Sequence, residues 1–152
     1  MADFEFYDSA VESELKKNGI YASVTKGVSM QPLFKTNRDM IIIKTPDVPP
    51  RRFDVVLYKS RSGKYVLHRI VKVRDDEYII RGDNTYSLEH VPKDQILAVL
   101  TEFNRKGKRR SASNKGYRLY ARLWNFIYPL RYLYVKSLSL LRMVYRVVFK
   151  KK

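Results

Sequence analysis

The chain has 152 residues, of which 45% are hydrophobic, and a formal net charge of +16. This length predicts about one domain, and this composition excludes a mainly disordered chain. The absence of cysteine excludes disulfides, thiolate metal sites and a cysteine nucleophile.

The positive charge is concentrated at one end of the chain. All 15 Asp and Glu precede residue 103, where 16 Lys and Arg nearly balance them, while residues 103–152 hold the other 15 Lys and Arg. Such an asymmetry indicates an anionic partner, either nucleic acid or a membrane surface. We therefore expect a domain over residues 1–103, with its core at about 20–103, a basic linker over 104–116 and a basic tail over 117–152.

The start of the chain carries no targeting signal. Its first residues are acidic and lack a basic stretch followed by an apolar run, so we expect no secretory signal and no N-terminal membrane anchor. Nowhere do about 18 uncharged apolar residues run together, so no helix is expected to span a bilayer.

The pattern of apolar residues predicts one short helix followed by strands. Residues 8–18 have the early acids and late lysines of a short helix, and Gly19 follows them as its stop signal. In the first expected strand, Ile20, Ala22 and Val24 alternate with other residues, as in a half-buried strand. The strands expected from such patterns are 20–25, 40–44, 55–59, 65–74, 77–81 and 96–103. Short strands joined by hairpin turns predict a mainly β, antiparallel core, sandwich-like or barrel-like, with helices as additions.

The basic tail is rich in Leu, Tyr, Val and Arg and is interrupted at Pro129, which predicts two amphipathic helices. Polar residues that share one helical face in each half are Arg118, Arg122 and Asn125, and then Arg142, Arg146 and Lys150. The favoured interpretation is that these helices lie on an anionic lipid surface, where each cation adds about 1 kcal/mol. Two alternatives stay open: the apolar faces pack on the β core or on another subunit, or Tyr and Arg together bind nucleic acid.

One serine stands where the first strand ends. Gly27 precedes Ser29 by two residues and Pro32 follows it by three. A glycine permits unusual backbone conformations and a proline fixes φ, so we expect a tight, non-helical turn that can present the hydroxyl of Ser29. An ordinary corner between strand and loop fits the same residues.

The sequence also supplies a possible base and a possible carboxylate. Of the two histidines, His68 lies within an expected strand, and His90 lies in a polar segment and is interpreted as a surface residue. An imidazole, with a pKa near ~6.5, can take the proton of a serine, and a carboxylate such as Asp83 can orient the ring. Two isolated histidines without cysteines predict no metal site, and we expect no cofactor.

Four segments occur in an order and with gaps typical of a known family. They are Gly27-Val28-Ser29-Met30-Gln31-Pro32-Leu33, Asp54-Val55-Val56-Leu57-Tyr58, Val66-Leu67-His68-Arg69-Ile70-Val71-Lys72-Val73 and Ile79-Ile80-Arg81-Gly82-Asp83-Asn84. Together they resemble the successive boxes of the signal peptidase I family, over residues 20–103. The resemblance implies a serine endopeptidase with an all-β fold that cuts a signal or leader peptide, docked in extended form, after small residues.

The resemblance also implies roles for individual residues. His-Arg-Ile stands where the common bacterial enzymes have a lysine, which is similar to the histidine-type branch of the endoplasmic reticulum, archaea and some Gram-positive bacteria. Ser29 would then be the nucleophile, His68 the general base and Asp83 the third member. The residues expected to bind substrate are Gly27, Met30 and Pro32.

The sequence departs from the family at several points. Arg38-Asp39 and Phe53-Asp54 stand where the family usually has Gly-Asp, so differently shaped turns are expected there. Gly27 lacks the hydroxyl that lysine-type enzymes often use to bind the oxyanion, which leaves the backbone N–H of Ser29 as the main donor.

The missing anchor requires another route to a membrane. We expect the basic tail to replace it, giving a peripheral, membrane-associated peptidase on the cytoplasmic face that has no export signal. Two rival functions are a catalytically inactive binding module with a peptidase-like fold and a nucleic-acid-binding protein that acts through the basic tail.

Overall fold

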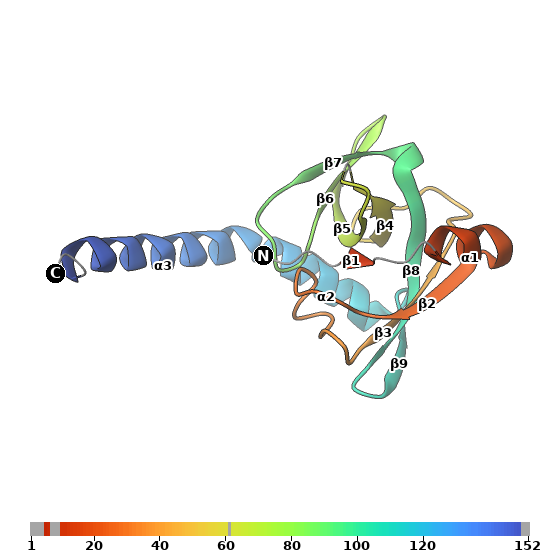
Figure 1. Cartoon of the computed structure of the whole chain (residues 1–152), viewed down its shortest axis with the longest axis horizontal. Helices are drawn as coiled ribbons and strands as arrows, with labels where there is room; N and C mark the ends of the chain where they lie inside the picture. Colours follow the sequence, from red (N-terminus) through yellow and green to blue (C-terminus); the bar gives the residue numbers. More distant parts are fainter. Residues whose placement is uncertain (1–4, 7–9, 61, 150–152) are drawn as a thin grey trace.

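The structure, a computed structural model, describes residues 5–6, 10–60 and 62–149. Within these residues the fold is mainly antiparallel β, with helices near both ends of the chain (Figure 1). The strands are β1 (Glu5–Phe6), β2 (Ile20–Val24), β3 (Met40–Lys44), β4 (Val55–Lys59), β5 (Tyr65–Val73), β6 (Glu77–Arg81), β7 (Glu89–Pro92), β8 (Ile96–Arg105) and β9 (Lys108–Ser111). The helices are α1 (Ala10–Asn18), the 3-10 turn η1 (Lys93–Gln95), α2 (Lys115–Phe126) and α3 (Tyr128–Phe149).

The described strands form one open sheet in the order β2-β3-β8-β4-β5-β6-β7, with β1 paired to β5 and β9 paired to β8. Every pairing is antiparallel. The predicted bounds of β3, β4 and β6 are confirmed, and β2 and β5 each end one residue earlier than expected. The expected mainly β, antiparallel architecture is therefore confirmed, whereas β7 and β9 were not predicted.

The centre of the sheet is buried on both faces. In β4, Val55 and Leu57 belong to one apolar cluster, while Val56 and Tyr58 belong to a second cluster on the other face. Strands buried on both faces read as continuous apolar runs rather than as alternating ones, which is the pattern of β4. The first cluster also contains Met30 and other residues of the segment that holds the expected nucleophile.

Strand β2 differs from the expectation in which of its faces is buried. Its alternation is present, but Ile20 and Val24 are exposed, and Tyr21 is the residue that packs against the core. At one end of the sheet order, β2 therefore presents apolar side chains outward.

The predicted helices form, and their ends follow their sequence signals. The helix expected at 8–18 begins within the described residues at Ala10; its expected cap lies outside them. Gly19, with φ +66°, ends it and donates its N–H to the carbonyl of Leu15. The side chain of Asn114 caps α2, and Pro129 lies in the first turn of α3, where a missing N–H costs little.

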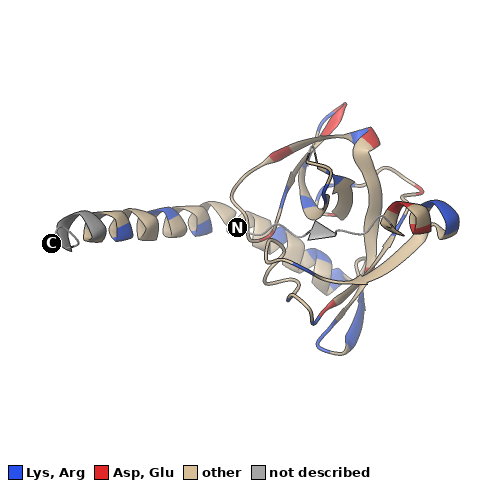
Figure 2. Ribbon diagram, in the orientation of Figure 1, with Lys and Arg blue, Asp and Glu red and all other residues tan. Residues whose placement is uncertain are grey.

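The expected basic linker is largely ordinary secondary structure. Strand β8 continues to Arg105, turns at Gly107 with φ +76° and pairs with β9, and α2 begins at Lys115. Lys and Arg positions occur along both this hairpin and the two helices that follow it (Figure 2). Beyond the sheet, α3 projects away from the rest of the molecule (Figure 1). The side chains of Arg146 and Lys150, expected on one face of this helix, lie outside what the structure describes.

Candidate active site

The expected turn around Ser29 is present. Gly27 has φ +80°, a conformation that favours glycine, and its carbonyl accepts a hydrogen bond from the hydroxyl of Thr36. Ser29 begins a series of turns in which Phe34 donates its N–H to the carbonyl of Met30, 3.0 Å away. The chain thus leaves β2 and immediately forms the tight, non-helical turn that the sequence predicts.

Asp39 holds the ends of this loop together. Its backbone carbonyl accepts from the N–H of Thr25 at 2.9 Å, and its carboxylate accepts from the N–H of Lys35 at 2.8 Å and from the guanidinium of Arg38 at 2.8 Å. Burial acts to raise the pKa of Asp39, but these hydrogen bonds outweigh it and hold that pKa below its usual value. A buried, ionised carboxylate therefore fixes the loop that carries Ser29.

Gly82 is the point at which distant segments meet. A Cβ added to it would lie 2.7 Å from the backbone oxygen of Ser29 and 2.9 Å from Nε2 of His68. Both distances are shorter than ordinary contacts, so a side chain at this position would displace one of the two neighbours. The N–H of Asn84 also donates to the carbonyl of Ser29, at 2.7 Å. The structure therefore brings together Ser29, His68 and the turn after β6.

His68 lies in β5, as predicted, and is 1% exposed. Its Nδ1 lies 2.8 Å from Oε1 of Glu89, at the start of β7, and 3.4 Å from the hydroxyl of Tyr58. That hydroxyl donates to the other carboxylate oxygen of Glu89, at 2.5 Å. On the opposite side of the ring, Nε2 is the one buried side-chain nitrogen or oxygen without a hydrogen-bond partner among the described residues.

Glu89 is ionised under ordinary conditions. Burial acts to raise its pKa, but hydrogen bonds to His68 and Tyr58 and the attraction of His68 outweigh burial and hold that pKa below its usual value. A carboxylate therefore contacts the imidazole, and sequence analysis missed it. Glu89 carried no motif, and β7 was not recognised as a strand, so its pairing with β6, in which Ile80 faces Glu89, could not be foreseen.

Asp83 does not contact His68, contrary to the expectation. Its two carboxylate oxygens accept from Nε and Nη2 of Arg69, each at 2.7 Å, and the pair is almost completely buried. The reason is the alternation of a strand: His68 and Arg69 are neighbours in β5, so their side chains point to opposite faces. Asp83 lies with Arg69, and Glu89 takes the place expected for it beside His68.

The three residues expected to bind substrate have different environments. Met30 is 1% exposed and packs in the first apolar cluster, so its side chain is core and not a surface for a peptide. Pro32 is exposed and Gly27 is half-buried. Ser29 itself is 2% exposed, so the candidate nucleophile and base are both enclosed in this structure.

The turn at Phe53 keeps a glycine-like conformation without a glycine. Phe53 has φ +77°, a strained region for a bulky side chain. Its carbonyl accepts from Nη1 of Arg69 at 2.8 Å, and its N–H donates to the carbonyl of Ile70 at 2.8 Å. Phe53 therefore has, without being a glycine, a backbone conformation that favours glycine.

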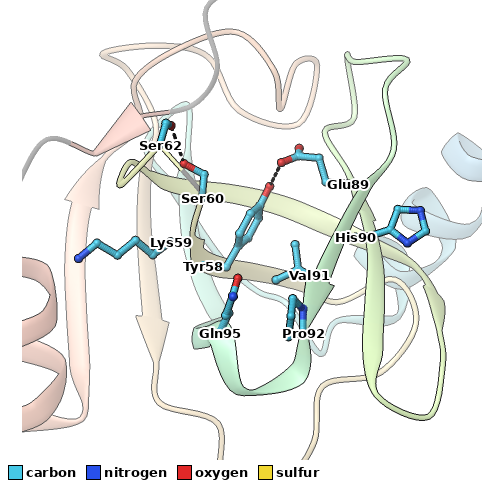
Figure 3. A pocket seen from close by; sticks show the side chains of 9 residues that line it. All are labelled: Tyr58, Lys59, Ser60, Ser62, Glu89, His90, Val91, Pro92 and Gln95. Atoms are coloured by element: carbon cyan, nitrogen blue, oxygen red, sulfur yellow. Dashed lines mark hydrogen bonds between the residues drawn. The ribbon is translucent and has the colours of Figure 1, made fainter.

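A pocket of about 540 Å³ opens beside Glu89 (Figure 3). Its lining residues are Tyr58, Lys59, Ser60, Ser62, Glu89, His90, Val91, Pro92 and Gln95. Figure 3 shows the carboxylate of Glu89 directed to the hydroxyl of Tyr58, while the ring of His90 lies apart from both. His90 is a surface residue, as expected, but it lies in β7 and pairs with Glu77. Neither Ser29 nor His68 lines this pocket.

No metal-binding cluster is found in the part of the chain that the structure describes. There, no group of three or more His, Asp or Glu side chains is arranged to hold an ion.

The beginning of the basic tail packs against the turn that contains Asp83. Trp124 Nε1 and Arg131 Nη2 both donate to the backbone carbonyl of Asp83, each at 2.9 Å. The hydroxyl of Tyr120 donates to its carboxylate at 3.4 Å, and that of Tyr117 accepts from Arg69 at 3.2 Å. Helix α2 and the first turn of α3 are therefore connected to the same turn that contacts Ser29 and His68.

The opposite side of these helices is apolar and exposed. Phe126 is 81% exposed and Leu130 is 69% exposed. The exposed large hydrophobic residues of the basic tail are Leu119, Leu123, Phe126, Leu130, Leu133, Tyr134, Val135, Leu140, Leu141, Met143 and Tyr145. Among the described residues, no helix is both long enough and apolar enough to cross a membrane.

A comparison with models of known protein families finds no match to this chain, and a comparison with curated proteins finds none either.

Proposed function

We propose that this chain is a serine endopeptidase that resembles the histidine-type branch of signal peptidase I, with Ser29 as nucleophile and His68 as general base. The observation that carries the proposal is the meeting at Gly82, where the backbone of Ser29 and Nε2 of His68 contact the same point. A nucleophilic serine needs a base within reach, and here the backbone of Ser29 and the ring of His68, far apart in the chain, both approach Gly82.

The reaction follows from these two side chains. Nε2 of His68 takes the proton of the Ser29 hydroxyl as Oγ attacks the carbonyl carbon of the scissile peptide bond, and the imidazolium then gives that proton to the leaving amine. Water, deprotonated by the same nitrogen, releases the acyl group from Ser29. The backbone N–H of Ser29 serves as the oxyanion donor, because Gly27 offers no hydroxyl.

The substrate class is a signal or leader peptide that binds in extended form and is cut after a small residue. Strand β2 supports this part of the proposal, since it lies at one end of the sheet order and leads directly into the turn of Ser29. An extended peptide can add to such an edge by main-chain hydrogen bonds, and Ile20 and Val24 give it an apolar outer face. The finer fold type, a sandwich-like or barrel-like peptidase core of the signal peptidase kind, is part of the same proposal.

The proposed location is an anionic membrane surface on the cytoplasmic face, with the basic tail as a peripheral anchor. Its exposed leucines and aromatic residues provide an apolar face, and residues 103–152 carry 15 cations and no acid. Helices of this kind lie in the interface without crossing the bilayer. Binding to nucleic acid through the same cations is the alternative that the experiments must separate.

The decisive experiment is cleavage of leader-like peptides with small residues before the scissile bond, measured by mass spectrometry in the presence of vesicles that contain anionic lipid. Wild-type protein should cleave such a peptide, and Ser29→Ala and His68→Ala should each lose nearly all of this activity, because nucleophile and base act as one unit. Ser13→Ala, which removes an exposed hydroxyl on α1, is the matched control and should cleave normally. Undiminished cleavage by the Ser29→Ala protein would refute the assignment.

A binding module without catalysis is the second candidate, and the near-complete burial of Ser29 and His68 favours it. In that case the wild-type and Ser29→Ala proteins should bind the same peptide with equal affinity and leave it intact.

A further inference from the structure

We infer that Glu89, and not Asp83, is the carboxylate that positions His68 as a base, and that Tyr58 fixes Glu89 in place. The inference rests on the proposed function, since a base must exist for it to be positioned. It goes further because it gives a role to Glu89, which no motif in the sequence indicated, and to the side chain of Tyr58.

The first step is the protonation state of the ring. An ionised carboxylate only accepts hydrogen bonds, so the 2.8 Å contact between Nδ1 and Oε1 of Glu89 requires a proton on Nδ1. A neutral imidazole carries one ring proton, so Nε2 must then be unprotonated. Nε2 is the nitrogen that faces Gly82 and has no partner among the described residues. Glu89 therefore selects the tautomer in which the nitrogen beside Ser29 can accept a proton.

The second step is the orientation of Glu89. Its other oxygen accepts from the hydroxyl of Tyr58, whose own side chain is 1% exposed. The carboxylate is thus held between a buried imidazole and a buried phenol, and this arrangement fixes both the carboxylate and the ring that it contacts. Figure 3 shows the hydroxyl of Tyr58 directed to the carboxylate of Glu89, and both residues line the pocket.

The third step is the position of Tyr58 relative to His68. Its hydroxyl lies 3.4 Å from Nδ1 as well as 2.5 Å from Glu89. If the carboxylate is removed, the hydroxyl loses Glu89 as its acceptor, and Nδ1, 3.4 Å away, is an acceptor within its reach. A hydroxyl that donates to Nδ1 requires that nitrogen to be unprotonated, which moves the ring proton to Nε2 and blocks the base.

Asp83 cannot take over this role. Both of its oxygens are occupied by Arg69, and the pair is buried, so a turn of the carboxylate toward the imidazole would leave a buried guanidinium without its counter-charge. Glu89, by contrast, has a side chain that is 34% exposed beside the pocket, so water helps to keep it charged.

The experiment is ¹⁵N NMR of the full chain with labelled histidine, recorded where the rings are neutral. There are two histidines, so loss of one set of signals in His90→Gln assigns the other set to His68. In the wild type, the His68 signals should show a proton on Nδ1 and none on Nε2. Glu89→Ala should move the proton to Nε2, and Glu89→Ala combined with Tyr58→Phe should weaken that shift, because the donor to Nδ1 is gone.

Peptide cleavage provides the second readout. Glu89→Ala should lower kcat/KM about 10²-fold or more, since an imidazole in the wrong tautomer is a poor base, while Tyr58→Phe should cost less and leave the tautomer unchanged. Glu89→Asp is the conservative variant and should restore the Nδ1 tautomer. Retention of the Nδ1 proton in Glu89→Ala would overturn the inference. The NMR result does not depend on cleavage, so a tautomer shift in a protein without peptidase activity would support the positioning by Glu89 and reject only the proposed function.

Discussion

The two halves of the helical region have similar compositions and different environments. Helix α2 and the first turn of α3 lie against the sheet and direct Trp124 and Arg131 to the carbonyl of Asp83. The rest of α3 projects from the molecule, with Leu133, Tyr134 and Leu141 each more than half exposed. The halves differ in whether the fold offers them a partner, because the first half reaches the turn of Asp83, whose backbone carbonyl accepts from Trp124 and Arg131.

The two halves of the tail differ in what they contact. Its first half contributes hydrogen bonds to the turn that contacts Ser29 and His68, so it is part of the domain. Its second half offers an apolar face that the chain itself leaves uncovered, which is the property of an interaction surface. Packing on the core is therefore found for the first half, and binding to a membrane stays a prediction for the second half.

Truncation at two positions should separate these roles most strongly. A chain ending at Ser113 loses the hydrogen bonds to Asp83 and Arg69, each worth about 1 kcal/mol, and exposes a buried ion pair, so its unfolding temperature should fall steeply. A chain ending at Tyr132 should unfold at nearly the wild-type temperature and lose most of its flotation with anionic vesicles. Thermal unfolding of both proteins, with flotation of the second, measures the difference.

The longer truncated protein also distinguishes lipid from nucleic acid. It should be compared with the full chain in a mobility-shift experiment with single-stranded DNA. A tail that shifts nucleic acid and does not float with vesicles would contradict the proposed membrane role.

The next largest effect is expected at the turn of Asp83. The first half of the tail, α2 with the first turn of α3, packs against this turn and is called the docked half; the rest of α3 is called the projecting half. Asp83→Asn leaves the fully buried Arg69 without its counter-charge and should lower the free energy of unfolding by about 3 kcal/mol or more. Leu133→Ser, in the projecting half, should leave that free energy almost unchanged. Urea denaturation of the two proteins provides the measurement, and equal stabilities would show that the Asp83 turn does not hold the fold.

A smaller effect is expected from single contacts in the docked half. Trp124→Phe keeps an aromatic ring and removes the N–H that donates to Asp83, so it should cost about 1 kcal/mol of stability. Tyr134→Phe removes a polar group from an exposed ring in the projecting half and serves as the matched control. If both changes have the same effect on denaturation, the docking contact contributes nothing.

An effect of similar size is expected from single cations, on vesicle binding in one half and on stability in the other. Arg142→Gln in the projecting half should weaken binding to anionic vesicles by about 1 kcal/mol and leave stability unchanged. Arg131→Gln should lower the stability and leave vesicle binding nearly unchanged. Arg131 donates to the carbonyl of Asp83 and stacks over Trp124 at 3.7 Å. Vesicle binding should also decline with added salt, which screens such charges. Equal losses of vesicle affinity in the two variants would contradict the division between the halves.

Much of the fold could be predicted because its strands carry strong local patterns. Val55–Lys59 and Glu77–Arg81 are short apolar runs bounded by turn residues, and both strands form at the predicted bounds. Strand β7 could not be recognised, because Glu89–Pro92 is short, polar and ends in proline, and it depends on pairing with β6.

The candidate site could be predicted in part for the same reason. Gly27 and Pro32 mark the turn of Ser29 locally, and His68 lies in a recognisable strand. The choice of carboxylate is not local: it depends on which face of β5 each side chain takes and on the register that brings Glu89 to His68. The resemblance to the signal peptidase I family favoured Asp83, and the alternation of side chains along β5 places Asp83 with Arg69.

The junction between α2 and α3 has a mechanical consequence. The N–H of Ile127 donates to the carbonyl of Leu123, and that of Arg131 to the carbonyl of Ile127, so helical hydrogen bonds continue on both sides of Pro129. The 22 residues of α3 then extend about 33 Å from a base that is fixed to the Asp83 turn. A helix held at one end in this way keeps a constant distance and angle to the turn of Ser29. On the proposed membrane surface, it would therefore set the height of that turn above the lipid.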